Sequence, residues 1–91
     1  MQVLLIEDDV ALAEALIQTL KNEGFTVNHI AQGKQAISWI KTELPDIVIL
    51  DLGLPDLDGT EVLKLLRREN AELPVLVLTA RISLEDKVNG L

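Results

Sequence analysis

Runs rich in apolar residues occur at four places along the chain and predict four β-strands. The two clearest runs occupy residues 2–7, which read QVLLIE, and residues 46–51, which read DIVILD. A third run, PVLVL, occupies residues 74–78, and a weaker, more polar one, FTVNHI, occupies residues 25–30. Continuous runs rich in Val, Ile and Leu, rather than strict alternation with polar residues, are typical of strands covered on both faces, as in parallel sheets.

Apolar residues at helical spacing follow each run and predict four helices. The first stripe ends before Gly24, the second before Leu44-Pro45 and the third before Pro74, and Ser83 is a suitable N-cap for the fourth. The stripes consist of Leu12, Ala13, Leu16, Ile17 and Leu20; of Ala36, Ile37 and Ile40; of Val62, Leu63, Leu65 and Leu66; and of Leu84, Val88 and Leu91. Strands that alternate with helices in this way predict an α/β fold with a doubly wound parallel sheet.

Length and composition fit one small domain with an aliphatic core. The chain has 91 residues, of which 48% are hydrophobic and only 2% aromatic. A chain of this size buries roughly 60% of its unfolded surface. It contains no cysteine, which excludes disulfides and thiolate metal sites.

The charge balance narrows the class of partner. Eight basic residues stand against fifteen acidic ones, giving a net charge of −7. This charge argues against direct binding to nucleic acid or to anionic membrane surfaces, because both depend on Lys and Arg. No secretory signal and no apolar run of membrane-spanning length is present, so we expect a cytoplasmic protein.

Acidic residues stand at the ends of two predicted strands. Glu7 and Asp8 follow the first strand, and Asp51 closes the third. With strand order 2-1-3-4, these two ends meet at the point where the strand order reverses, which is where ligands bind in such sheets. We therefore expect the three carboxylates to converge, whereas Asp9 stands where it would cap the first helix.

Three carboxylates in one crevice repel each other, so either some take up protons or a cation lies among them. Oxygen ligands without nearby His or Cys suit Mg²⁺ or Mn²⁺. An aspartate beside such a cation can serve as a covalent acceptor, because the cation neutralises charge on a transferring phosphoryl group.

The motifs LLIEDD, IVILDLGLPDLDG and PVLVLTA, in this order and spacing, resemble the receiver domain of bacterial two-component response regulators. The resemblance covers essentially the whole chain, residues 1–91, and implies the flavodoxin-like, CheY-like architecture with strand order 2-1-3-4. It also implies a regulatory phosphoacceptor domain that assists its own phosphotransfer, rather than an enzyme.

The resemblance assigns roles to individual residues. It implies that Asp51 accepts a phosphoryl group from a phosphohistidine on a sensor histidine kinase. The ligands of Mg²⁺, or of Mn²⁺ in its place, would be Glu7, Asp8, Asp51 and the backbone carbonyl of Gly53. Many relatives carry Met at the position of Gly53, but a carbonyl ligand tolerates any side chain. Thr79 corresponds to the hydroxyl that moves toward the phosphoryl group.

The acidic triplet that begins with Glu7 is similar to that of the winged-helix (OmpR/PhoB-type) class. In that class the receiver controls a C-terminal DNA-binding domain by dimerising. The resemblance therefore implies transcription control by a parent protein.

Receiver domains have five strands and five helices, so we expect this chain to be a receiver without its fifth strand and fifth helix. The family's active-site Lys stands at the end of the fifth strand and has no counterpart here, so we expect slow phosphorylation. An unpaired fourth strand would also recruit another chain, and we expect self-association through it or exchange of elements with a partner.

Two alternatives remain open at this point. The chain could be a pseudo-receiver, an interaction domain that is never phosphorylated, as the missing Lys would suggest. It could also be a phosphoaspartyl hydrolase, but Gly53 stands where such enzymes typically carry a second acid. Among other residues, we expect His29 to face solvent, Trp39 to cover the edge of the core, and Lys64, Arg67 and Arg68 to form a solvated basic face.

Overall fold

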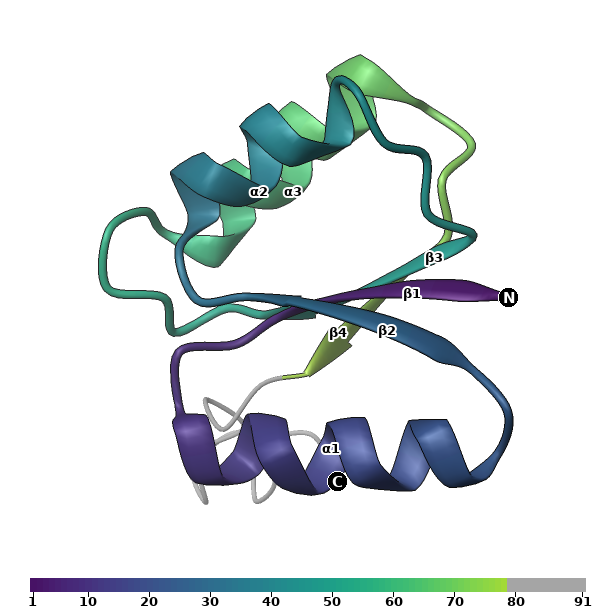
Figure 1. Ribbon diagram of the computed structural model, residues 1–91. Coiled ribbons are helices and arrows are strands. Elements are labelled where there is room, and N and C mark those ends of the chain that lie inside the picture. Colours follow the sequence, from purple (N-terminus) through teal and green to yellow (C-terminus); the bar gives the residue numbers. More distant parts are fainter. Residues whose placement is uncertain (79–91) are drawn as a thin grey trace, which may run out of the picture.

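The computed structural model describes residues 1–78 and contains a parallel sheet between two layers of helix (Figure 1). All three strand pairings are parallel, and the strand order is β2-β1-β3-β4. The elements, in chain order, are β1 (Gln2–Ile6), α1 (Val10–Asn22), β2 (Thr26–Ile30), α2 (Gly33–Ile40), β3 (Ile47–Asp51), α3 (Gly59–Glu69) and β4 (Val75–Leu78). The predicted α/β class and the strand order are confirmed. The helix predicted after Ser83 lies outside the described residues.

The two faces of the sheet carry separate clusters of buried side chains. Helices α2 and α3 lie on one face and α1 lies on the other (Figure 1). Along β1, Leu4 and Ile6 pack toward α2 and α3, whereas Val3 and Leu5 pack toward α1. A central strand that is buried on both faces explains why its sequence is continuously apolar.

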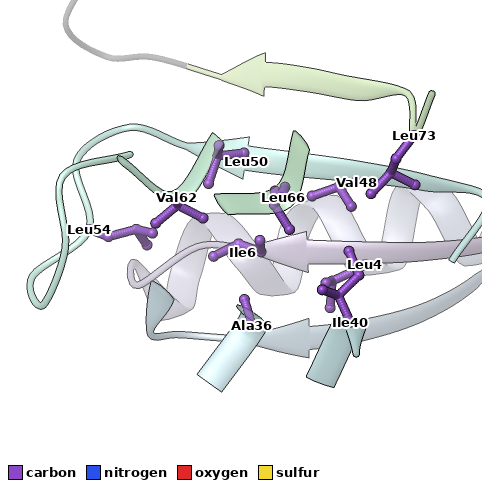
Figure 2. Close-up of a cluster of buried hydrophobic side chains, with 10 residues drawn as sticks. All are labelled: Leu4, Ile6, Ala36, Ile40, Val48, Leu50, Leu54, Val62, Leu66 and Leu73. Atoms are coloured by element: carbon purple, nitrogen blue, oxygen red, sulfur yellow. The ribbon is translucent and has the colours of Figure 1, made fainter. Parts of the chain in front are cut away.

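Figure 2 shows the larger cluster, which lies between the sheet and the helices α2 and α3. It consists of Leu4, Ile6, Ala36, Ile40, Val48, Leu50, Leu54, Val62, Leu66 and Leu73. Trp39 is partly buried and packs against this cluster, as predicted. Full burial of each large aliphatic side chain contributes about 1.5–3 kcal/mol, so this face fixes the positions of α2 and α3.

Helix boundaries follow the local chemistry of the chain. Asp9 caps α1, because its side chain accepts a hydrogen bond from the Leu12 amide at 3.1 Å. Gly24 has a φ of 91° and follows the C-terminus of α1, where a residue without Cβ is needed. Both positions were predicted. Helix α2 ends at Ile40, earlier than the Leu44-Pro45 boundary suggested.

The assignment of one residue to the first predicted stripe is wrong. Leu12 is 43% exposed, whereas Ala13 is fully buried and Leu16, Ile17 and Leu20 pack against the cluster beside it. Adjacent residues of an α-helix are rotated by about 100° around its axis. Leu12 therefore lies beside the buried face of α1, not within it.

None of the helices in residues 1–78 combines the length and the apolar character needed to cross a membrane.

Candidate functional site

The site lies at the carboxyl ends of β1 and β3, which are adjacent and parallel in the sheet. Ile6 pairs with Leu50, so the residues that follow these two positions lie at the same edge. Glu7 and Asp8 come directly after β1, and Asp51 is the last residue of β3. The topology thus brings together acids that are more than forty positions apart in the sequence.

The carboxylates of Glu7, Asp8 and Asp51 form one cluster. Each offers an oxygen atom, and these oxygens all lie within 4.8 Å of one another. Glu7 is buried, Asp51 is half-buried and Asp8 is exposed. The cluster is therefore open to solvent on the side of Asp8 and closed on the side of Glu7.

Glu7 is fixed by the backbone around it. Its amide donates to the Ile30 carbonyl at 3.1 Å, and its carboxylate accepts from the Asp9 amide at 3.1 Å. Its side chain is only 3% exposed, and this burial raises the pKa of Glu7 above its ordinary value. The Asp9 amide opposes the rise in pKa, whereas Asp51 and the charge of Asp8 add to it.

The carboxylate cluster has no balancing cationic side chain in the described part of the chain. The ion pair found among residues 1–78 joins Lys64 to Glu61 on α3, and both side chains are largely exposed. A cluster of three carboxylate oxygens fits a hard divalent cation such as Mg²⁺, which would offset their mutual repulsion. The donor set contains no nitrogen or sulfur ligand within the described residues.

Asp9 and His29 flank the cluster without belonging to it. Asp9 uses its side chain to cap α1, as predicted. His29 is exposed, as expected, and its Nε2 lies 2.7 Å from the Glu7 carbonyl oxygen. This contact links the end of β2 to the backbone at the site.

Gly53 follows the cluster on the β3–α3 loop, which comprises residues 52–58. Its amide donates to Oδ1 of Asp51 at 3.1 Å, which orients the carboxylate. A Cβ added to Gly53 would lie 3.6 and 3.7 Å from the two Asp51 oxygens, an ordinary contact distance. Thr79, the remaining predicted site residue, lies outside the described residues.

The basic residues predicted to form a solvated face on α3 are exposed, but Arg67 is engaged. Its Nη1 donates to the backbone carbonyls of Ala71 and Leu73 and so braces the connection from α3 to β4. This contact gives Arg67 a structural role.

Asp56 lies on the same loop as Gly53 and has a role that the sequence did not reveal. Its two carboxylate oxygens accept hydrogen bonds from the amides of Gly33 and Lys34, at 2.8 and 3.0 Å. These bonds, the Lys34 amide foremost, lower the pKa of Asp56. One signal was present in the sequence: Gln32 precedes α2 and is a poor N-cap residue, so α2 needed a cap from elsewhere.

Comparison with known proteins identifies relatives of this architecture. The family described as "Response regulator receiver domain" matches residues 3–91. The chain is 43% identical over 89 residues to "Probable transcriptional regulatory protein TcrX" of Mycobacterium tuberculosis, which covers 98% of this chain and 38% of that protein. It is 45% identical over 91 residues to "Cell cycle response regulator CtrA" of Brucella ovis, which covers 100% of this chain and 39% of that protein.

A solved structure agrees with both matches. The Francisella response regulator 1452 receiver domain has a TM-score of 0.83 and 34% sequence identity, over 98% of this chain and 74% of that one. The chain thus spans less than two fifths of the length of the two curated relatives and most of the length of an isolated receiver domain. The shared motifs, the strand order and the extent of these matches place the chain in the response regulator receiver domain family of two-component signalling.

Proposed function

We propose that Asp51 is the phosphoacceptor of this receiver domain and that a sensor histidine kinase supplies the phosphoryl group. The observation that carries the proposal is the cluster of Glu7, Asp8 and Asp51 at the ends of β1 and β3. One Asp51 oxygen would form a bond to phosphorus while the bond from phosphorus to the kinase imidazole breaks. The product is an aspartyl phosphate, and the imidazole leaves with the bonding electron pair.

The chain's own residues prepare Asp51 for this step. The Gly53 amide donates a hydrogen bond to one Asp51 oxygen, and the buried carboxylate of Glu7 lies in the same cluster. Glu7, Asp8, Asp51 and the Gly53 carbonyl would hold Mg²⁺, or Mn²⁺ in its place. The cation, when bound, supplies neutralising charge for the phosphoryl group. The domain is therefore a regulatory phosphoacceptor that assists its own phosphotransfer, rather than an enzyme acting on a separate substrate.

The consequence of phosphorylation is proposed from the resemblance and the relatives. Thr79 is the hydroxyl expected to move toward the phosphoryl group. The names of the two curated relatives describe a transcriptional regulatory protein and a cell cycle response regulator. We propose that a longer parent protein of the winged-helix class controls transcription in the cytoplasm. A polypeptide of residues 1–91 would in addition self-associate through β4 or exchange elements with a partner.

The test is mass spectrometry of the chain after incubation with acetyl phosphate and Mg²⁺. We expect an added mass of one phosphoryl group, which maps to Asp51. The adduct should not form when a chelator is added before the phosphodonor. Asp51→Asn should abolish the adduct, whereas Asp46→Asn, at the opposite end of β3, should retain it. An unmodified chain after incubation with acetyl phosphate and with a cognate kinase would favour the pseudo-receiver instead.

A further inference from the structure

The three described helices do not begin in the same way. Asp9 caps α1 and Asp58 caps α3, and each side chain accepts an amide hydrogen bond within its own first turn. Gln32 occupies the corresponding position of α2 and makes no such bond. The first amides of α2 therefore depend on a group from elsewhere in the chain.

Asp56 supplies that group across 22–23 positions of sequence. One of its oxygens accepts from Gly33 and the other from Lys34. A single carboxylate thus satisfies two amides that the helix itself leaves unpaired, and it stands at the positive end of the helix dipole. A local cap would satisfy α2 without involving the β3–α3 loop.

The same loop packs closely against the start of α2. A Cβ added to Gly33 would lie 3.3 Å from Cβ of Leu57 on this loop, and 2.7 Å from Cγ2 of Val62 on α3. Leu54, in the middle of the loop, is buried in the cluster between the sheet and the helices (Figure 2). The hydrogen bonds of Asp56 therefore act on a segment that already contacts α2.

We propose that Asp56 is a positioning residue for the Asp51 site, because its two hydrogen bonds to the N-terminus of α2 fix the loop that carries Gly53. The role of the Gly53 carbonyl as a ligand of Mg²⁺ rests on the proposed function. The effect of Asp56 on the geometry of the loop is independent of that function. Asp56 is not a member of the cluster of Glu7, Asp8 and Asp51, so its effect on the site would pass through Gly53.

Two variants separate loop positioning from helix capping. In Asp56→Asn, one carboxylate oxygen becomes an NH₂ group, which is a donor and cannot accept the second amide. The double variant Gln32→Asp, Asp56→Asn gives α2 a local cap of the kind that α1 and α3 have, and restores the net charge. Asp46→Asn is the matched control, since Asp46 also accepts a backbone amide, that of Gln2 at 2.6 Å, at the far end of the sheet.

Two measurements report on the conformation of the loop around Gly53. NMR gives the solvent exchange rate of the Gly53 amide without metal, and calorimetry gives the dissociation constant of Mg²⁺. In Asp56→Asn we expect the exchange rate to rise by about threefold or more and Mg²⁺ to bind about three- to tenfold more weakly, less than for a direct partner of a ligand. The double variant should recover the unfolding midpoint of the unmodified chain but neither of these values.

If the double variant recovers both the exchange rate of the Gly53 amide and the dissociation constant of Mg²⁺, then Asp56 only caps α2 and the inference is overturned. Unchanged values in a folded Asp56→Asn chain would overturn it as well. If the unmodified chain binds no Mg²⁺, the proposed metal site fails, and the exchange rate of the Gly53 amide still decides whether Asp56 positions the loop.

Discussion

Glu7 is the residue whose protonation is most strongly tied to its surroundings. It is buried to 3% exposure and faces two other carboxylates, and its pKa is raised above the ordinary value of 4.5. Burial therefore favours the neutral, protonated carboxyl of Glu7 and raises the free energy of its charged form. A cation in the cluster reverses that balance, since it favours the charged form of each ligand.

Glu7 predicts an unusual dependence of stability on pH. The folded state keeps the Glu7 carboxyl protonated to a higher pH than the unfolded state does. The stability that Glu7 contributes to the folded state is therefore fully present below pH 4.5, and it is lost as the pH rises through the pKa of the folded state. We expect Glu7→Gln to gain free energy of unfolding, relative to the unmodified chain, as the pH rises in metal-free buffer. Denaturant unfolding at a series of pH values measures this gain.

Glu43→Gln is the control for this prediction, because Glu43 is exposed on the connection between α2 and β3. Its difference from the unmodified chain should stay constant over the same pH range. Saturating Mg²⁺ should remove the gain seen for Glu7→Gln. A gain with falling rather than rising pH would contradict the account of Glu7.

At the scale of elements, the strands were predictable and the long-range contacts were not. The strands β1 and β3 are buried on both faces and so leave continuous apolar runs in the sequence. The edge strands β2 and β4 are only partly buried, and the run that predicted β2 is accordingly weaker. Leu12 was misplaced because an apolar residue beside a stripe cannot be told from one within it by spacing alone. The role of Asp56 was missed because its partners lie on another element, and only the folded chain brings them together.

The surroundings of Gly59 and Gly53 predict that substitution by Ala changes the free energy of unfolding much more at Gly59 than at Gly53. A Cβ added to Gly59 would lie 2.2 Å from Cα of Leu52, and backbone cannot move aside as a side chain can. We expect Gly59→Ala to lower the free energy of unfolding by about 3 kcal/mol or more, in the range of severe overpacking. Denaturant unfolding followed by circular dichroism measures this change.

Gly53→Ala is the matched variant, because its Cβ would meet only ordinary contacts with Asp51. We expect its free energy of unfolding to change by less than about 1 kcal/mol, and the binding of Mg²⁺ to persist, since a carbonyl ligand does not depend on the side chain. Equal losses of stability in the two variants would contradict the close packing of α3 against Leu52.

At the scale of the whole molecule, topology makes the site. Strand order β2-β1-β3-β4 places β1 beside β3, and their parallel direction brings both carboxyl ends to one edge. The sequence could predict this convergence because acids stand at both strand ends and the motifs resemble a known family. It could not predict that Glu7 is buried while the adjacent Asp8 is exposed, because that difference is set by the packing of the folded chain.

The edge of the sheet predicts association of a polypeptide of residues 1–91. Within residues 1–78, β4 pairs with β3 along one edge, and no strand in that part of the chain pairs with the other. Leu76 on β4 is 52% exposed. Because unpaired apolar edge strands recruit other chains, we expect sedimentation velocity to show dimers or larger species that increase with concentration.

Leu76→Lys should shift this equilibrium toward the monomer, because charged side chains protect edge strands. Leu44→Lys is the control, since Leu44 is 76% exposed and lies outside β4. A chain that stays monomeric at high concentration would contradict the prediction.

The central claim is that Glu7, Asp8 and Asp51 form one cation site, and calorimetric titration with Mg²⁺ tests it most directly. We expect a single site in the unmodified chain, with binding weakened about tenfold or more in Asp8→Asn and in Asp51→Asn, since loss of a ligand should cost at least as much as loss of its supporting partner. Asp9→Asn removes the same charge from the neighbouring position but keeps a side chain able to cap α1, so it should bind Mg²⁺ nearly as well as the unmodified chain. Equal weakening in all three variants would show a diffuse attraction of charge, and unchanged binding in Asp51→Asn would show that Asp51 does not belong to the site; either result would contradict the account.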